Sequence, residues 1–274
     1  MDMREILARS RRCLTAESRD VIAAYIASRR CADGGYSGKA STSDLYYTMF
    51  AAASLEALRK WRPLLALPRY LERFGVGEGL DFIHAACLAR LWAGFPVRRD
   101  LGSIFERIEA YRAADGGYHH AVRGAAHGSA YALFSALDTY AAARRAFPAP
   151  SQAIASLESL RTSDGGYANE PEQAFSQTNA SAAALLARMR LGLSAEDECV
   201  RFLLARHEPV TGGFFAFPHA YRPDLLSTAS ALFALRAAGA ALSGIAPGVR
   251  GFVEALWTES GGFSGMLNDG APDC

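Results

Sequence analysis

The sequence predicts an all-α fold in which pairs of helices repeat along one domain as a closed or stacked array. Two observations carry this prediction: a Gly-Gly-aromatic phrase recurs along the chain, and a helix-like run of residues flanks each copy on both sides. A two-helix unit that repeats every ~40–50 residues is typical of helical arrays in which neighbouring units share one core. With 274 residues, 50% of them hydrophobic, the chain is long enough to build that core.

The recurring phrase consists of two glycines followed by tyrosine or phenylalanine. Its first glycines are 49, 47 and 49 residues apart in the last four copies, whereas the first two copies are 82 residues apart. The long step indicates a hidden unit, which we place at the degenerate segment FGVGEGLDF, and six units are therefore expected. The five clear copies are CADGGYSG at 31–38, AADGGYHH at 113–120, TSDGGYAN at 162–169, VTGGFFAF at 210–217 and ESGGFSGM at 259–266.

We expect a half-exposed outer helix before each phrase and a buried inner helix after it. Before the first phrase, apolar residues such as Ile22, Tyr25 and Ile26 recur at helical spacing among charged ones. After it, TMFAAASLEAL is almost free of charge and rich in small residues, which allows helices to approach on all sides. The glycines can adopt the positive φ that ends the outer helix, and the aromatic side chain then fills the gap between neighbouring pairs.

The sixth unit has no inner helix of its own, because the sequence ends with GGFSGMLNDGAPDC. Residues 3–13, MREILARSRRC, form a short helix-like stretch before the first outer helix. This stretch can take the empty inner position and close a ring; otherwise the array stays open. We therefore expect a single domain over residues 1–274, with six helix pairs closed by the N-terminal helix.

Composition excludes several classes of function. The 29 basic and 28 acidic residues leave no basic excess for nucleic-acid binding. No apolar run approaches the ~18–20 residues of a membrane span, and the first twenty residues are too polar for a signal peptide, so we expect a cytoplasmic protein. The five cysteines are scattered without a C-x-x-C pair, and we expect free thiols.

The repeat resembles the prenyltransferase and squalene-oxidase repeat of protein prenyltransferase β-subunits and of class II terpene cyclases, which are α/α toroids. The resemblance covers the whole chain and rests on five Gly-Gly-aromatic units, each but the last followed by a small-residue helix. It implies an α/α toroid that holds an apolar isoprenoid in a central cavity, with the diphosphate or reacting end near the mouth, where the inner helices begin. It also implies a possible protein partner, since the β-subunits work with a helical α-subunit.

The segment GGYSGKASTSDLYY at 34–47 resembles the family's Gly-Gly-Phe-x-Gly-Arg…Asp-x-Cys-Tyr. The match places Lys39 where a phosphate-binding arginine stands and Asp44 where a zinc-binding aspartate stands. Tyr47 falls at the tyrosine that follows in the family pattern.

Two further segments carry histidines that the resemblance singles out. In AAHGSAYALFSAL at 125–137, Ala-His-Gly opens an inner helix, and the match implies that His127 helps to hold a diphosphate at a helix N-terminus. In LDFIHAACLARL at 80–91, His84 matches a zinc-binding histidine. We take Asp44, His84 and His127 as the candidate catalytic residues.

Departures from the family pattern argue against a tightly bound zinc ion. The family's zinc-binding cysteine would fall at Tyr46, and the units occur in a different order; in the family order, Ser227 replaces the histidine. If a metal binds at all, we expect Asp44 and His84 to hold it, but two ligands are too few for tight zinc, so we assign no metal residues. Single aspartates at helix starts (Asp44, Asp81 and Asp224) are more often N-caps.

The acid run with which class II cyclases protonate an alkene is also absent, because SQTN stands at 176–179. Aromatic residues that we place early on inner helices can still line an isoprenoid cavity, with core packing as the alternative for each of them. The candidate substrate-binding residues are Lys39, Tyr46, Tyr47, Phe50, Trp92, Arg123, Tyr131 and Phe134.

Two interpretations of function remain. The first is an isoprenoid-handling enzyme, a prenyl or terpenoid-diphosphate transferase or cyclase, that binds an isoprenoid diphosphate or another apolar small molecule. The second is a non-catalytic toroid that binds a ligand or scaffolds a protein partner. His119 and His120 lie in the same loop as His127, where they either join a metal or diphosphate site or form an ordinary polar surface.

Overall fold

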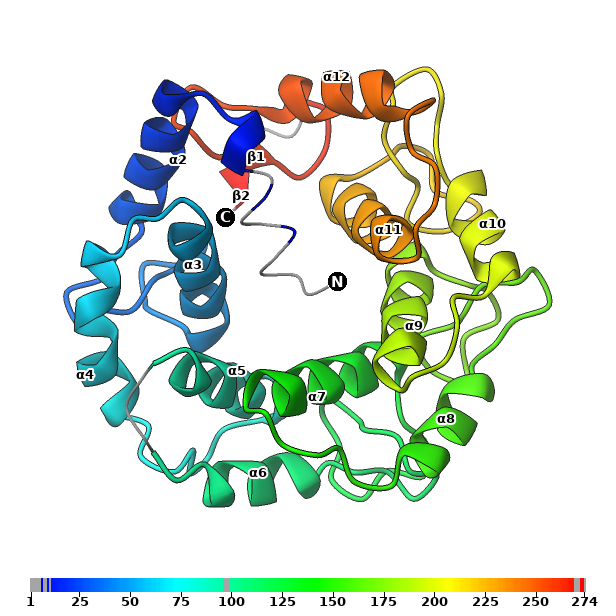
Figure 1. The fold of residues 1–274 in the computed structure, drawn as a ribbon, viewed down its shortest axis with the longest axis horizontal. Helices are drawn as coiled ribbons and strands as arrows, with labels where there is room; N and C mark the ends of the chain where they lie inside the picture. The colour runs from blue at the N-terminus through cyan, green and yellow to red at the C-terminus, as the bar shows by residue number, and fades with distance from the viewer. Residues whose placement is uncertain (1–5, 7–8, 10, 96–98, 269–271, 274) are drawn as a thin grey trace. The chain divides into compact units, whose positions relative to one another are not determined.

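The computed structural model describes residues 6, 9, 11–95, 99–268 and 272–273 (Figure 1). These residues form eleven α-helices, two short 3-10 helices and one pair of two-residue strands. The predicted all-α fold is therefore confirmed. None of the described helices is long and apolar enough to cross a bilayer.

The described helices alternate between outer and inner positions as the repeat predicts. Burial differs in the expected direction: inner helix α9 buries nine of its 13 residues, whereas outer helix α2 buries none. The outer helices are α2 (Ala16–Ser28), α4 (Leu67–Glu72), α6 (Gly102–Glu109), α8 (Pro150–Glu158), α10 (Asp197–Ala205) and α12 (Ala246–Leu256). The inner helices are α3 (Leu45–Ala57), α5 (Phe82–Ala93), α7 (Ala130–Ala142), α9 (Thr178–Arg190) and α11 (Leu225–Ala237). The 3-10 helices are η1 (Arg11–Cys13) and η2 (Arg62–Ala66).

The chain divides into two compact units. The first comprises Met1–Arg107, Trp257–Ser264 and Gly270–Cys274, and the second comprises Ile108–Leu256 and Gly265–Asp269. Within the first unit, α3 and α5 pack side by side and α2 contacts α3. Within the second, α9 packs between α7 and α11, while α8 and α10 lie on the outer side of these helices (Figure 1). The single-domain organisation stays a prediction.

Contacts that recur in several phrases join the outer helix to the inner helix. The motif aromatics Tyr36, Tyr118, Tyr167 and Phe214 are at most 1% exposed, as their predicted packing role requires. In three phrases the backbone N–H of the aromatic donates to a hydroxyl in the first turn of the inner helix, over 2.9 Å: Tyr36 to Thr48, Tyr167 to Ser181 and Phe214 to Thr228. The aspartate before the glycines ties the loop to the residues before the inner helix, as Asp33 does by accepting from Ser43 Oγ at 2.6 Å.

The phrase of the sixth unit, ESGGFSGM at 259–266 (the sixth phrase), packs against α2, the first outer helix. A Cβ atom at Gly262 would lie 2.6 Å from the Tyr25 ring of α2, so only glycine allows this approach. Gly213 makes the equivalent approach to Phe252 of the following outer helix, at 2.8 Å. The sixth repeat therefore uses α2 as its next outer helix.

An inner helix does not follow the sixth phrase in the part of the chain that the structure describes. Instead, β1 (Phe263–Ser264) pairs antiparallel with β2 (Pro272–Asp273). Most of the segment expected to take the empty inner position, residues 3–5, 7–8 and 10, lies outside the described residues, and its last part forms η1. Closure by this segment stays a prediction.

Candidate active site

The first unit brings Asp44 and His84 together at the starts of α3 and α5. Asp44 caps α3 by accepting two backbone N–H groups of its first turn at 2.7 and 3.3 Å, and Asp81 caps α5 by accepting the N–H of His84 at 2.9 Å. The predicted N-cap role of these aspartates, and of Asp224 at α11, is confirmed. Asp44 has a second contact as well, because its Oδ2 lies 2.8 Å from Nε2 of His84. On the other side of the ring, Nδ1 of His84 lies 2.8 Å from Oδ1 of Asp81.

The two carboxylates favour the protonated form of His84. Burial alone would lower the pKa of this imidazole, but the hydrogen bonds and charges of Asp44 and Asp81 outweigh burial and raise the pKa. A protonated ring can donate from both nitrogens, which matches the two contacts. With all three groups ionised, the cluster carries one net negative charge. Its side chains are partly open to solvent, with His84 32% and Asp44 34% exposed.

The zinc ion that the family resemblance implies does not fit these residues. Asp44 and His84 offer two ligands, and the position of the third holds Tyr46, whose ring packs edge-on against Phe50 at 4.8 Å. Cys87 of α5 is buried in the core, and burial raises the pKa of its thiol to about 12, so it is a packing residue. A catalytic zinc site requires about three protein ligands. We therefore derive no chemical step through zinc.

Aromatic side chains follow Asp44 along the first turns of α3. The Tyr46 ring lies 5.6 Å from the Tyr47 ring and 4.8 Å from the Phe50 ring, both edge-to-face. Phe50 is 43% exposed, and Lys39 is exposed in the loop that leads to α3. The start of α3 therefore presents three aromatic rings that follow a carboxylate.

The expected placement of Trp92 early on an inner helix is wrong. Because Asp81 caps α5, the helix begins at Phe82, and Trp92 falls in its last turn. The indole is 3% exposed, and the Arg99 guanidinium lies 4.4 Å from its ring centroid. Trp92 is a core residue at the other end of the helix from His84.

The second unit holds His127 in an exposed loop. Ser129 caps α7 by accepting the N–H of Ala132 at 3.2 Å, so His127 lies two residues before the cap rather than on the helix. Its side chain is 56% exposed, with Nδ1 3.7 Å from Oδ2 of Asp115. Arg123 lies in the same loop, with its guanidinium 5.2 Å from the ring centroid of Tyr111.

Two predicted aromatic residues do lie at the start of α7. Tyr131 is 40% exposed, and its backbone N–H donates to Oδ1 of Asn169 at 3.1 Å. Phe134, one turn further along, is half-buried. Both lie in the first two turns of the inner helix, where the sequence analysis placed them.

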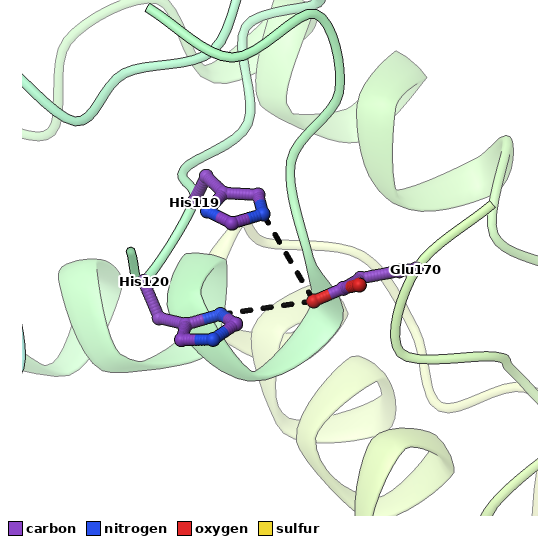
Figure 2. Close-up of side chains that lie close together, drawn as sticks. All are labelled: His119, His120 and Glu170. Atoms are coloured by element: carbon purple, nitrogen blue, oxygen red, sulfur yellow. Dashed lines mark ion pairs between the residues drawn. The ribbon is translucent and has the colours of Figure 1, made fainter. Parts of the chain in front are cut away.

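His119 and His120 gather with Glu170, a residue that the sequence analysis missed (Figure 2). Oε1 of Glu170 lies 4.0 Å from Nε2 of His119 and 3.7 Å from Nδ1 of His120, and the imidazole rings stack at 4.8 Å. Glu170 stands three residues after the motif tyrosine of the fourth repeat, and the histidines follow that of the third. Comparison of the loops at equivalent places in adjacent repeats is the signal in the sequence that could have found this contact.

The hydrogen bonds of His119 indicate a donor to Glu170 rather than a metal ligand. Its Nδ1 accepts the backbone N–H groups of Ala121 and Val122 at 3.1 and 2.9 Å. In the neutral ring the proton therefore resides on Nε2, which faces Glu170. A metal-bound histidine has the opposite arrangement, in which the second nitrogen donates a hydrogen bond.

Comparison with known proteins shows the family. Residues 4–145, 84–214 and 179–274 each match the Prenyltransferase alpha-alpha toroid domain, and the chain belongs to this family. Its fold is therefore the α/α toroid.

Two solved structures share this fold. One is a variant of the type II terpene cyclase MstE from Scytonema in complex with the product merosterolic acid A, with a TM-score of 0.68 and 14% identity over 91% of this chain and 82% of that one. The other is apo MstE, with a TM-score of 0.66 and 14% identity over 91% of this chain and 80% of that one. At this identity the likeness concerns the fold. Comparison with curated protein sequences gave no match.

Proposed function

We propose that the chain is an isoprenoid-handling enzyme, a prenyl or terpenoid-diphosphate transferase or cyclase. The observation that carries the proposal is the hydrogen-bonded chain Asp44–His84–Asp81 at the starts of two inner helices, followed by the aromatic side chains of α3. Breaking the C–O bond of an allylic diphosphate sends the electron pair to the diphosphate and leaves an allylic cation. A negatively charged cluster and aromatic faces both favour such a cation.

The polar head of the substrate needs basic partners. The candidates are Lys39 in the first unit and Arg123 and His127 in the second, all of which are exposed in loops that lead to inner helices. Arginine and lysine side chains bind phosphate oxygens through charge-assisted hydrogen bonds. Lys39 is the candidate within the first unit, Arg123 and His127 are the candidates within the second, and the substitution of each tests it by itself.

Ionisation of a diphosphate fits this chain better than protonation of an alkene. Protonation of carbon requires a strongly acidic carboxylic acid, and neutral polar residues occupy 176–179, where the family's acid run would stand. His84 is no substitute, because the raised pKa makes its imidazolium a weaker acid.

Calorimetric titration of farnesyl and geranylgeranyl diphosphate into the full chain tests the proposal, together with an assay for diphosphate release. We expect binding of one of them, weaker binding in His127→Ala, and slower release in Asp44→Asn. Asp224→Asn is the matched control, because Asp224 caps α11 in the same way but bonds to Ser227 instead of a histidine. If neither diphosphate binds, the proposal fails; binding without release would favour the alternative, a non-catalytic ligand-binding toroid.

A further inference from the structure

A cavity of about 170 Å³ lies within the first unit between α2, α3 and the sixth phrase. Side chains from both helices line it, and most of them are apolar or aromatic. The residues that the argument uses are Ile22 and Ile26 of α2, Phe50 and Ala51 of α3, Arg29 and Tyr36.

Arg29 is the charged residue of this wall, and it has no acidic partner among the described residues. Its Nη2 donates to the carbonyl oxygen of Gly38, while its Nε is buried without a hydrogen-bond partner. The partly buried Arg112, by contrast, contacts Glu109 at 2.9 Å, whereas Nε of Arg206 and of Arg222 is unpartnered like that of Arg29. A guanidinium without an acidic partner can form charge-assisted hydrogen bonds with a carboxylate that enters the cavity it lines.

Tyr36, on the same wall, lacks the partner that its counterparts in other repeats have. The hydroxyl of Tyr118 donates to Glu109 in the third repeat, and that of Tyr167 donates to Glu196 at 2.8 Å in the fourth. The hydroxyl of Tyr36 is buried without a partner in the described structure. Glu109 stands nine residues before Tyr118, and the residue nine before Tyr36 is Ala27. The counterpart of Arg112 in the first repeat is Arg30, which bridges Tyr36 as Arg112 bridges Tyr118, and the carboxylate of Glu109 has no counterpart there.

We propose that this cavity binds a small molecule with an apolar body and a carboxylate head, and that the head pairs with Arg29. A guanidinium and a carboxylate form two parallel hydrogen bonds, which explains a preference for this head over a hydroxyl or an amine. The volume is below the ~300–1,000 Å³ of sites for drug-sized ligands, so the body is short. The cavity shares Phe50 with the aromatic surface of α3 used in the proposed function, but the pairing of the head with Arg29 does not depend on that function.

Calorimetric titration of octanoate and octan-1-ol into the full chain tests the proposal. Octanoate should bind about tenfold or more tightly than octan-1-ol, because hydrogen bonds to a charged partner are worth that much. Arg29→Met keeps the apolar stem and should reduce octanoate to the affinity of the alcohol. Ala51→Leu should weaken both ligands by filling the cavity.

Arg30→Met is the matched control, because Arg30 is the exposed neighbour of Arg29 and does not line the cavity. It removes the same charge and should leave octanoate binding unchanged. The proposal is overturned if octanoate does not bind, if it binds no better than the alcohol, or if the two arginine variants behave alike. These titrations contain no diphosphate, so their outcome is separate from that of the proposed enzymatic function.

Discussion

Removing the charge of Asp44 should destabilise the first unit through the loss of its contact with His84. Asp44→Asn isolates this contact, because asparagine caps a helix about as well as aspartate. The two side chains are 34% and 32% exposed. The free energy by which this pair stabilises the fold therefore lies between two limits. An exposed ion pair contributes about 0.2–1 kcal/mol, and a buried hydrogen bond to a charged group contributes about 1.5–3 kcal/mol. We expect a coupling free energy of about 1 kcal/mol.

The coupling should depend on pH in one direction. Because folding raises the pKa of His84, the stabilisation is fully present below the ordinary value of 6.5 and is lost as the pH rises through the folded value. A double-mutant cycle of Asp44→Asn and His84→Ala, measured by urea unfolding at about pH 5.5 and about pH 9, reports it.

A matched variant distinguishes the contact from the cap. Asp224→Asn removes the charge of another N-cap that has no histidine partner in the described structure, so its effect should not follow the titration of an imidazole. A coupling that is absent at the lower pH, or larger at the higher pH, refutes the reasoning.

Three further predictions concern the core, the thiols and metal. Tyr118→Phe removes a buried hydroxyl that donates to the partly buried carboxylate of Glu109, and it should cost about 1.5–3 kcal/mol of unfolding free energy. Tyr36→Phe should cost almost nothing, and equal losses in urea unfolding would contradict this. Burial raises the pKa of the Cys87 and Cys199 thiols to about 12, so neither should react with a thiol reagent in the folded chain. Mass spectrometry should find both unmodified, and labelling of either before the chain unfolds would contradict this interpretation. Elemental analysis should find no stoichiometric zinc, and one zinc per chain that is lost in Asp44→Ala would instead favour a protein prenyltransferase.

Repetition made most of the fold predictable from the sequence. Four of the phrases bury their aromatic residue, and the positions of outer and inner helices followed from the spacing of the glycines together with the flanking helix-like runs. The hidden unit was placed correctly, although its outer helix α4 is only six residues long and follows the 3-10 helix η2. The pairing of β1 with β2 was not predicted, because two-residue strands leave almost no pattern in a sequence.

The local parts of the candidate site were predictable, and the parts that depend on contacts between loops were not. An N-cap such as Asp81 depends on residues within one turn, so the sequence indicates it directly. The meeting of Asp44 with His84 followed from their equivalent places on adjacent inner helices. Glu170 was missed because its contact joins loops of two repeats. The placement of Trp92 was wrong because Asp81 caps α5, so that the helix begins at Phe82 and Trp92 lies in its last turn.

The differences between equivalent repeat positions indicate where function resides. In the third repeat, Glu109 satisfies the motif tyrosine and an arginine, and this network stabilises the joint between outer and inner helix. The first repeat has Ala27 at that position and leaves buried polar atoms on Arg29 and Tyr36 without partners. Natural proteins keep few such groups, and they keep them where a ligand or a reaction requires them. The same repeat carries Asp44 and borders the cavity, so we propose that the first repeat gives up stability at the place where the small carboxylate ligand binds.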